Sequence, residues 1–431
     1  CHLVWAIKHF RVVLKKNYIM AATLKHWREA ATLILVTSSK LSRGISPQLT
    51  SANIAEVNAL NDSVSSVVPV VPSVDNADNF DILLLKRSSR SKFMPNLYVF
   101  PGGVAVNNDF SNEWLSVFRK LGADAQHTLF QMLSANSGSA APLFARPRDQ
   151  AFSDIPSEVA FRICAIRETF EESGVLLALP VEQSRNVVNS SCSNSKQGSL
   201  SPSLLYKDST VINSWRKRVN EDPNEFLRMC LELDLIPEIW SLYEWSNWLT
   251  PALARENFRR FDTIFFVCCV DHKPEAVEDA AETVNAVWAS PSSLLSSYFV
   301  QNGGLAVPQV YELSRLINFQ SARQLLMFVA NADRSRIERW LPCLVMCKDY
   351  NLEVLPGDDL YPKHADPTTT EIASVYSETL EELNSKFPNH HRVINLRPKP
   401  VYFPQCTLPQ TKEHVYPCIS VLNSIRMRPK L

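Results

Sequence analysis

Runs of apolar residues, bounded by polar or turn-forming residues, predict several β-strands along the chain. One such run occupies residues 27–39. The segments FDILLLKRSS (80–89) and LYVFPGG (97–103) follow it and are expected to pair as core strands. Further strands are expected at RFDTIFFVCCV (260–270), at the start of AETVNAVWASPSSLLSSY (281–298) and at WLPCLVMC (340–347).

Apolar residues at helical spacing predict a helix over residues 157–173. The helix would begin after Pro156 and end at Gly174, which suits a left-handed cap. The segments 308–319 and 321–332 show helical patterns as well, and the aromatic-rich residues 215–248 are also expected to be helical. The apolar positions of the first helix are Val159, Ile163, Ile166 and Phe170.

These elements divide the chain into three parts. Residues 1–26 form a leader, in which Met20 is interpreted as the start of the working protein. Residues 27–300 form the main domain, with an insertion at about 110–156 and a Ser/Asn-rich surface loop at about 185–205. Residues 301–431 are expected to form a helical C-terminal extension and a tail.

Composition narrows the class of protein. The 431 residues include 44 basic and 44 acidic ones, so the overall charge gives no reason to expect nucleic acid as a partner. The longest apolar runs, such as TIFFVCCV (263–270), fall short of the roughly 20 residues that span a bilayer. The ten cysteines lack the spacing of a zinc site and are expected to be reduced, mostly buried thiols.

The predicted helix at 157–173 carries the candidate chemistry. Glu171 and Glu172 follow Glu168 by three and four residues, so they converge with it on one side of the helix, where like charges repel. A hard cation such as Mg²⁺ or Mn²⁺ would relieve this repulsion and keep water sites for a phosphate. Arg167 could hold one of the carboxylates in a fixed rotamer. The alternative is a solvated acidic face, which is usual for an isolated acidic cluster.

The stretch RETFEESGV (167–175) resembles the second half of the box of the Nudix hydrolases, with Thr169 at a position that is usually apolar. The first half is matched by Gly103 and, after five residues, by Asp109 where the family has glutamate. Asp109 and Arg167 are separated by 57 residues instead of seven, which leaves the role of Asp109 open. Glu158 is an alternative, at a spacing one residue off.

The resemblance implies an α/β (α+β) Nudix fold, in which a mixed β-sheet lies between helices and a long insertion interrupts the box. The interrupted box, LLLKRSSRSKFMPNLYVFPGGV (83–104) and later segments are similar to a branch of coenzyme A and acyl-coenzyme A diphosphatases. This branch implies hydrolysis of the substrate's pyrophosphate to 3',5'-ADP and 4'-phosphopantetheine or its acyl form. The acyl chain would need an apolar channel, which residues 215–248 or the insertion could line.

The same resemblance assigns roles to residues. Arg167, Glu168, Glu171 and Glu172 would be catalytic, and the three glutamates would bind Mg²⁺ or Mn²⁺. One of these glutamates or a loop residue, with Glu278 and Glu282 as candidates, would be the general base.

Substrate contacts are expected from Arg87 and from two glycines. Gly102 and Gly103 would let the backbone approach the phosphates, although an ordinary turn is the alternative. Arg87 would form a bidentate contact with a phosphate. Its neighbours Lys86, Arg90 and Lys92 form either part of the same site or a solvated basic loop.

Two other functions stay open at this stage. One is a Nudix hydrolase for NADH, ADP-ribose or capped RNA, and the other is a non-catalytic Nudix-like binding module. The intact Glu168, Glu171 and Glu172 argue against the binding module. The C-terminal Pro-Lys-Leu shares two residues with a peroxisomal address and would engage the import receptor, whereas IKHFRVVLKKNY (7–18) allows a mitochondrial presequence.

Overall fold

The computed structural model describes most of the chain from residue 27 onward. The predicted leader (1–26), Lys92 and the C-terminal Pro-Lys-Leu lie outside the described residues. The described ranges are 27–38, 79–91, 94–134, 141–193, 209–252, 259–279, 282–301, 303–333, 337–369, 371–396, 401–410, 414–418 and 422–424.

A mixed eight-stranded sheet forms the centre of the described part of the chain. Its strands follow the order β10-β7-β8-β1-β2-β3, while β4 pairs with β1 and β9 pairs with β2. Strands β1 and β8 are parallel, and β2 and β4 are antiparallel to β1. These strands are β1 (Arg28–Ser38), β2 (Phe80–Arg87), β3 (Tyr98–Val99), β4 (Gly102–Val104), β7 (Tyr243–Leu249), β8 (Phe261–Val270), β9 (Thr283–Ala289) and β10 (Arg339–Trp340).

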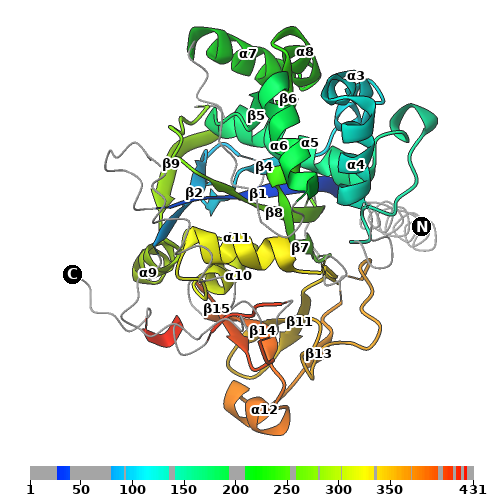
Figure 1. The fold of residues 1–431 in the computed structure, drawn as a ribbon. Coiled ribbons are helices and arrows are strands. Elements are labelled where there is room, and N and C mark those ends of the chain that lie inside the picture. The colour runs from blue at the N-terminus through cyan, green and yellow to red at the C-terminus, as the bar shows by residue number, and fades with distance from the viewer. Residues whose placement is uncertain are drawn as a thin grey trace, which may run out of the picture.

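Helices cover both faces of this sheet (Figure 1). Alternate residues of β1 point to opposite faces: Leu33 and Leu35 join one core, and Ile34 and Val36 join the other. The first core lies under α5 (Ser157–Ser173), and the second lies under α10 (Val307–Leu316) and α11 (Ala322–Asn331). The predicted sandwich of a mixed sheet between helices is therefore confirmed.

The predicted insertion is a packed helical unit. Trp114 and Phe118 are buried, and the ring of Trp114 lies 5.9 Å from that of Phe226. The insertion therefore adds to the first core and is not an open loop. Its elements are η3 (Asn107–Phe110), α3 (Trp114–Phe118), η4 (Arg119–Leu121), α4 (Ala123–Ser134) and η5 (Gln150–Phe152).

The prediction of a loop at 185–205 was wrong for its first part. Helix α6 (Val181–Ser193) extends into it and packs against α4, with Ser184 and Val188 buried four residues apart. Packing of this face outweighs the weak helix propensity of a Ser/Asn-rich segment. The rest of the predicted loop, from 194, lies largely outside the described residues.

The prediction of helix over 215–248 was correct only at its start. Helices α7 (Ser209–Glu221) and α8 (Glu225–Glu232) are followed by β6 (Leu235–Pro237) and η6 (Ile239–Ser241). Strand β6 pairs with the earlier β5 (Ala178–Pro180) in a two-stranded sheet. The last residues form β7, because their backbone pairs with β8.

The predicted helical C-terminal extension also needs correction. Helices α10 and α11 agree with it, while α9 (Pro291–Gln301) ends the predicted main domain, but a five-stranded sheet with its own small core follows α11. Local patterns of four to six residues in this Pro-rich region were too short to predict the pairing. The sheet has the order β13-β11-β12-β14-β15 and consists of β11 (Cys343–Met346), β12 (Asn351–Val354), β13 (Ser374–Val375), β14 (His391–Leu396) and β15 (Val401–Cys406), with α12 (Leu380–Lys386) beside it.

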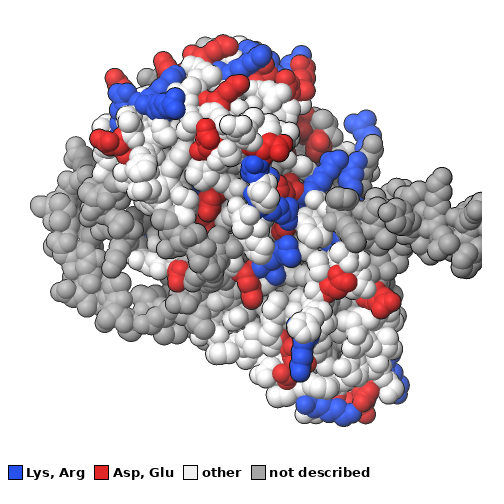
Figure 2. All heavy atoms as spheres, turned by 90° about the vertical axis from the view of Figure 1, so that its right-hand side faces the viewer, with Lys and Arg blue, Asp and Glu red and all other residues white. Residues whose placement is uncertain are grey.

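The surface agrees with the balanced composition. On the face presented in Figure 2, Lys and Arg side chains lie among Asp and Glu side chains. Among the helices that the structure describes, none combines the length and apolar character needed to cross a membrane. The cysteines of the described ranges are all free thiols.

Candidate active site

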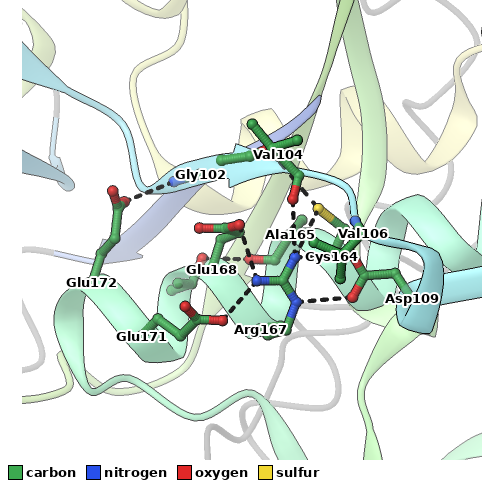
Figure 3. Close-up of polar contacts among 12 residues, drawn as sticks. Gly102, Val104, Val106, Asp109, Cys164, Ala165, Arg167, Glu168, Glu171 and Glu172 are labelled. Carbon is green, nitrogen blue, oxygen red and sulfur yellow. Dashed lines mark hydrogen bonds and ion pairs between the residues drawn. The ribbon is translucent and has the colours of Figure 1, made fainter. Parts of the chain in front are cut away.

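Helix α5 carries the four charged residues that the sequence predicts to be catalytic. It ends at Ser173, and Gly174 takes a left-handed conformation (φ 74°) and donates its N–H to the carbonyl of Phe170 at 2.9 Å. The predicted helix and its glycine cap are therefore confirmed. Because α5 packs against β1 and β4, its carboxylates lie beside the strand that carries Gly102 and Gly103 (Figure 3).

Arg167 contacts two of the predicted metal ligands. Its Nη1 donates to Glu168 Oε1 at 2.9 Å and to Glu171 Oε1 at 2.6 Å, and its Nη2 donates to the carbonyl of Val104 at 3.1 Å (Figure 3). The two carboxylates therefore converge on a single nitrogen. The expectation that Arg167 holds a carboxylate in place is confirmed for both glutamates.

Asp109 holds Arg167 in turn. The Arg167 Nε donates to Asp109 Oδ1 at 2.8 Å and Nη2 donates to Oδ2 at 2.9 Å, while Oδ2 also accepts the N–H of Val106. Both charged side chains are only 2% exposed. Asp109 is thus in contact with Arg167, whereas the alternative, Glu158, lies nine residues before Arg167, or about 13 Å along the helix axis. The role of Asp109 in the reaction stays a prediction.

Glu172 points in another direction, toward β4 and β2. Its Oε2 accepts the N–H of Gly102 at 3.0 Å, and its Oε1 lies 3.7 Å from Nη1 of Arg87. Gly102 has a φ of +152°, and a Cβ there would overlap the backbone of Ala31 and Thr32. Glycine is therefore required for β4 to present this N–H to the carboxylate.

Gly103 serves a different carboxylate. A Cβ at this position would overlap the carboxylate of Glu168 and no backbone atom among its three nearest neighbours. The missing side chain leaves the space that Glu168 occupies. Both glycines thus bring backbone close to the glutamates, and their contact with a phosphate stays a prediction.

Burial makes these carboxylates unusually easy to protonate. It raises the pKa of Glu171 to about 8, and Glu168 adds to this shift while Arg167 opposes it. Burial also raises the pKa of Glu172 well above its ordinary value, with the charge of Glu168 adding to the effect. The pKa of Glu168 is likewise raised by burial, against the opposing effect of Arg167. The site therefore holds more negative charge than its own cations stabilise.

This charge fits a divalent cation. In the described part of the chain, the carboxylates of Asp109, Glu168, Glu171 and Glu172 pair with only two guanidiniums, those of Arg167 and Arg87. The unmatched charge is that of a divalent ion, and carboxylate oxygens are the donors that Mg²⁺ and Mn²⁺ prefer.

The carboxylates do not yet form a coordination shell. No three His, Cys, Asp or Glu side chains among the described residues are arranged as metal ligands, since Arg167 and Gly102 take the carboxylate oxygens. Ligation would require the glutamates to turn away from these donors.

Arg87 joins the site to one of the two candidate bases. Its Nη2 lies 3.5 Å from Oε2 of Glu282, and its Nε donates to Ser91 Oγ at 3.1 Å. The side chain of Glu282 is 66% exposed, and its charge contributes to the raised pKa values of Glu168 and Glu172. The charge of Glu278, the other candidate, contributes to the electrostatic environment of Arg216.

The other predicted basic residues are not part of this cluster. Lys86 lies over the ring of Tyr98, with its Nζ 5.7 Å from the ring centroid, and Arg90 is exposed. Lys92 lies outside the described residues. Of the predicted basic group, Arg87 is the member that the structure places beside the glutamates.

The tryptophans at 215–248 are packed in the interior of the main domain. Trp215, Trp240, Trp245 and Trp248 are all buried and belong to the two cores of the main domain. In contrast, the sequence offered no signal for Arg216, Asp279 and Thr283, which contact the end of α5 or the loop that carries Glu282.

Comparisons with known proteins identify the family of this chain. A family model described as the NUDT19 Nudix domain matches residues 27–316, and one described as the NUDT19 C-terminal domain matches residues 344–403. The chain therefore belongs to the Nudix hydrolases, in the group that these two models define.

Curated relatives share most of the chain. The acyl-coenzyme A diphosphatase NUDT19 of Xenopus laevis is 38% identical over 387 residues, which cover 88% of this chain and 93% of that protein. The protein of the same name from Homo sapiens is 37% identical over 346 residues, 80% of this chain and 88% of its own length. A crystal structure of a Nudix hydrolase from Alicyclobacillus acidocaldarius is 17% identical, covers 70% of this chain and 96% of its own, and has a TM-score of 0.42.

Proposed function

We propose that the protein is a metal-dependent diphosphatase that hydrolyses the pyrophosphate of coenzyme A and acyl-coenzyme A. The products would be 3',5'-ADP and 4'-phosphopantetheine or its acyl form. The observation that carries this proposal is the group of Glu168, Glu171 and Glu172 on one helix, with excess negative charge beside Arg87. The substrate class is supported by the names of the relatives, which are acyl-coenzyme A diphosphatases.

Glu168, Glu171 and Glu172 would hold Mg²⁺ or Mn²⁺. When bound, such an ion supplies Lewis-acid activation of water and neutralises charge on the phosphoryl oxygens. Asp109 and Arg167 keep the backbone of α5 and β4 in register beneath the glutamates, since Arg167 also binds the carbonyl of Val104. The helix that carries the carboxylates is thus held in place before substrate arrives.

Arg87 and Glu282 would act on the substrate side. The Arg87 guanidinium is 15% exposed and can exchange its long contact with Glu172, at 3.7 Å, for a phosphate oxygen. The Glu282 carboxylate is solvent-accessible and would accept the proton of the attacking water. The water oxygen would form a new bond to one phosphorus of the pyrophosphate, the bridging P–O bond would break, and each product would carry its phosphate as a monoester.

The decisive experiment compares the wild-type chain with Glu172→Gln and Glu158→Gln. Each protein is incubated with coenzyme A, acetyl-coenzyme A, NADH and ADP-ribose, with and without Mg²⁺ or Mn²⁺, and the products are identified by mass spectrometry. Metal-dependent release of 3',5'-ADP is expected from wild type and from Glu158→Gln, whose residue lies at the far end of α5. Glu172→Gln should abolish it.

The other outcomes discriminate between the alternatives. Turnover of NADH or ADP-ribose alone would keep the fold and the site but exclude coenzyme A as the substrate. Absence of turnover with every substrate would favour a binding module. Equal rates for wild type and Glu172→Gln would exclude the proposed metal site.

We also propose that the protein is directed to peroxisomes by its C-terminal Pro-Lys-Leu, although Pro429 departs from the usual small residue. Imaging of the tagged chain, with and without residues 429–431, tests this assignment. Punctate localisation that persists after the deletion would exclude this address, and mitochondrial localisation would favour the N-terminal alternative.

A further inference from the structure

The last carbonyl groups of α5 accept hydrogen bonds from donors outside the helix. The last carbonyls of a helix have no partner within the helix. Here the carbonyl of Glu172 accepts the hydroxyl of Thr283 at 3.2 Å, and the carbonyl of Ser173 accepts the N–H of Val277 at 2.9 Å. Both donors belong to the segment that carries Glu282. The end of the glutamate-bearing helix is therefore a docking point for this segment.

Arg216 joins the two parts from a third element, α7. Its Nε and Nη2 donate to the carbonyl of Glu171 at 3.1 and 3.0 Å, and Nη2 also donates to the carbonyl of Val277 at 2.8 Å. One guanidinium thus holds the helix and the loop at a set separation. A cation at the carboxyl end of a helix is also favoured by the helix dipole.

Asp279 continues this connection to Glu282. Its Oδ1 accepts the N–H of Glu282 at 3.0 Å, the N–H of Thr283 at 2.8 Å and the hydroxyl of Thr283 at 3.0 Å. The backbone of Glu282 is therefore bound to the same turn that contacts α5. Displacement of this turn would move Glu282 relative to Arg87 and Glu172.

We propose that Arg216 is a positioning residue, which sets the place of Glu282 relative to the glutamates of α5 by bridging the carbonyls of Glu171 and Val277. This inference rests on the proposed hydrolase function and on Glu282 as its base. Arg216 touches no substrate in this account and acts through the loop. A lysine would supply the charge but not a planar fork that reaches two carbonyls, so it should replace arginine only in part.

The test compares Arg216→Met and Arg216→Lys with Arg218→Met as a matched control. Arg218 is on the same helix, but its guanidinium stacks on Trp215, 3.6 Å from the ring centroid, and pairs with Glu225. Arg216→Met should lower kcat for coenzyme A by about 10- to 100-fold and change KM by less than about 3-fold. The kcat of Arg216→Lys should lie between those of Arg216→Met and wild type, and Arg218→Met should keep the wild-type kcat.

A double-mutant cycle separates positioning from general structural damage. If Arg216 acts through Glu282, adding Arg216→Met to Glu282→Gln should reduce kcat little beyond the single Glu282→Gln. The proposal would be overturned if the fold-reductions in kcat of the two single variants multiplied in the double variant. It would also be overturned if both Arg216 variants kept the wild-type kcat. If Arg216→Met does not fold, the same cycle with Arg216→Lys decides.

The experiments give different results if the hydrolase function is wrong and if only the role of Arg216 is wrong. Wild-type protein without turnover of any substrate would refute the hydrolase assignment and this inference together. Wild-type turnover combined with multiplicative losses would refute the role of Arg216 alone.

Discussion

Arg167 and Asp109 form a buried two-point ion pair across 58 positions of the sequence, with N–O distances of 2.8 and 2.9 Å. Asp109 lies at the start of the insertion and Arg167 in the middle of α5. The insertion therefore leaves the interrupted box intact in space, because its helices pack onto the core and its ends stay beside β4 and α5.

Loss of this pair should destabilise the fold. In Asp109→Asn the buried Arg167 loses its main counter-charge, and the free energy of unfolding should fall by about 3 kcal/mol. Asp109→Glu keeps the negative charge, so its free energy of unfolding should fall by less than that of Asp109→Asn. Some loss remains because the extra methylene strains the packed site. Urea denaturation measures both. Asp124→Asn, at an exposed position of α4, is the control, and equal losses in the two asparagine variants would contradict the importance of the pair.

The two adjacent glycines should respond differently to alanine. In Gly102→Ala the new Cβ meets the backbone of Ala31 and Thr32, so the free energy of unfolding should fall by about 3 kcal/mol. In Gly103→Ala the three atoms nearest the Cβ all belong to the movable carboxylate of Glu168, so folding should be nearly retained while kcat falls about 100-fold. Denaturation and steady-state kinetics on both variants check this contrast, and a fully active Gly103→Ala would contradict it.

Substitution of Arg87 should change KM for coenzyme A, whereas substitution of the solvent-exposed Arg90 should not. Arg87→Gln removes a guanidinium that lies beside Glu172 and Glu282, and KM for coenzyme A should rise about 10-fold, the effect of roughly 1.4 kcal/mol. Arg90→Gln changes an exposed side chain and should leave KM near its wild-type value. Initial-rate kinetics over a range of substrate concentrations distinguish the two. Wild-type KM in Arg87→Gln would remove Arg87 from the substrate site.

Acid should destabilise the protein through His391. This buried imidazole donates from Nδ1 to the carbonyl of Pro356, and in its neutral form it accepts at Nε2 from the hydroxyl of Tyr311. Burial lowers the pKa of His391 to about 4. The unfolded chain binds this proton near pH 6.5, so the stabilisation is fully present above that pH and is lost as the pH falls toward 4.

The loss expected from His391 alone is about 2 kcal/mol between pH 7.5 and pH 5.0, and the raised pKa of Glu171 acts in the opposite direction. The contribution of His391 is therefore the difference in pH dependence between variants, measured by urea denaturation at both pH values. His272→Gln, whose imidazole is 66% exposed, should show the pH dependence of wild type, whereas His391→Gln should lack the loss of about 2 kcal/mol. Identical pH dependence in wild type and His391→Gln would contradict the assignment.

The sequence by itself determined the local parts of this protein. The strands around β1, β2 and β8, the helix α5 with its glycine cap, and the grouping of Glu168, Glu171 and Glu172 all follow from neighbouring residues with a regular period. Such patterns are visible without knowledge of the fold, because the residues that produce them are at most a few turns or one strand apart.

Only the tertiary structure decided which distant residues meet. It assigned Asp109 to Arg167, placed Glu282 and not Glu278 beside Arg87, brought Arg216 to the end of α5, and paired the C-terminal strands into a sheet. These contacts depend on how helices and strands pack as whole elements, and side-chain spacing within one segment carries no information about that packing.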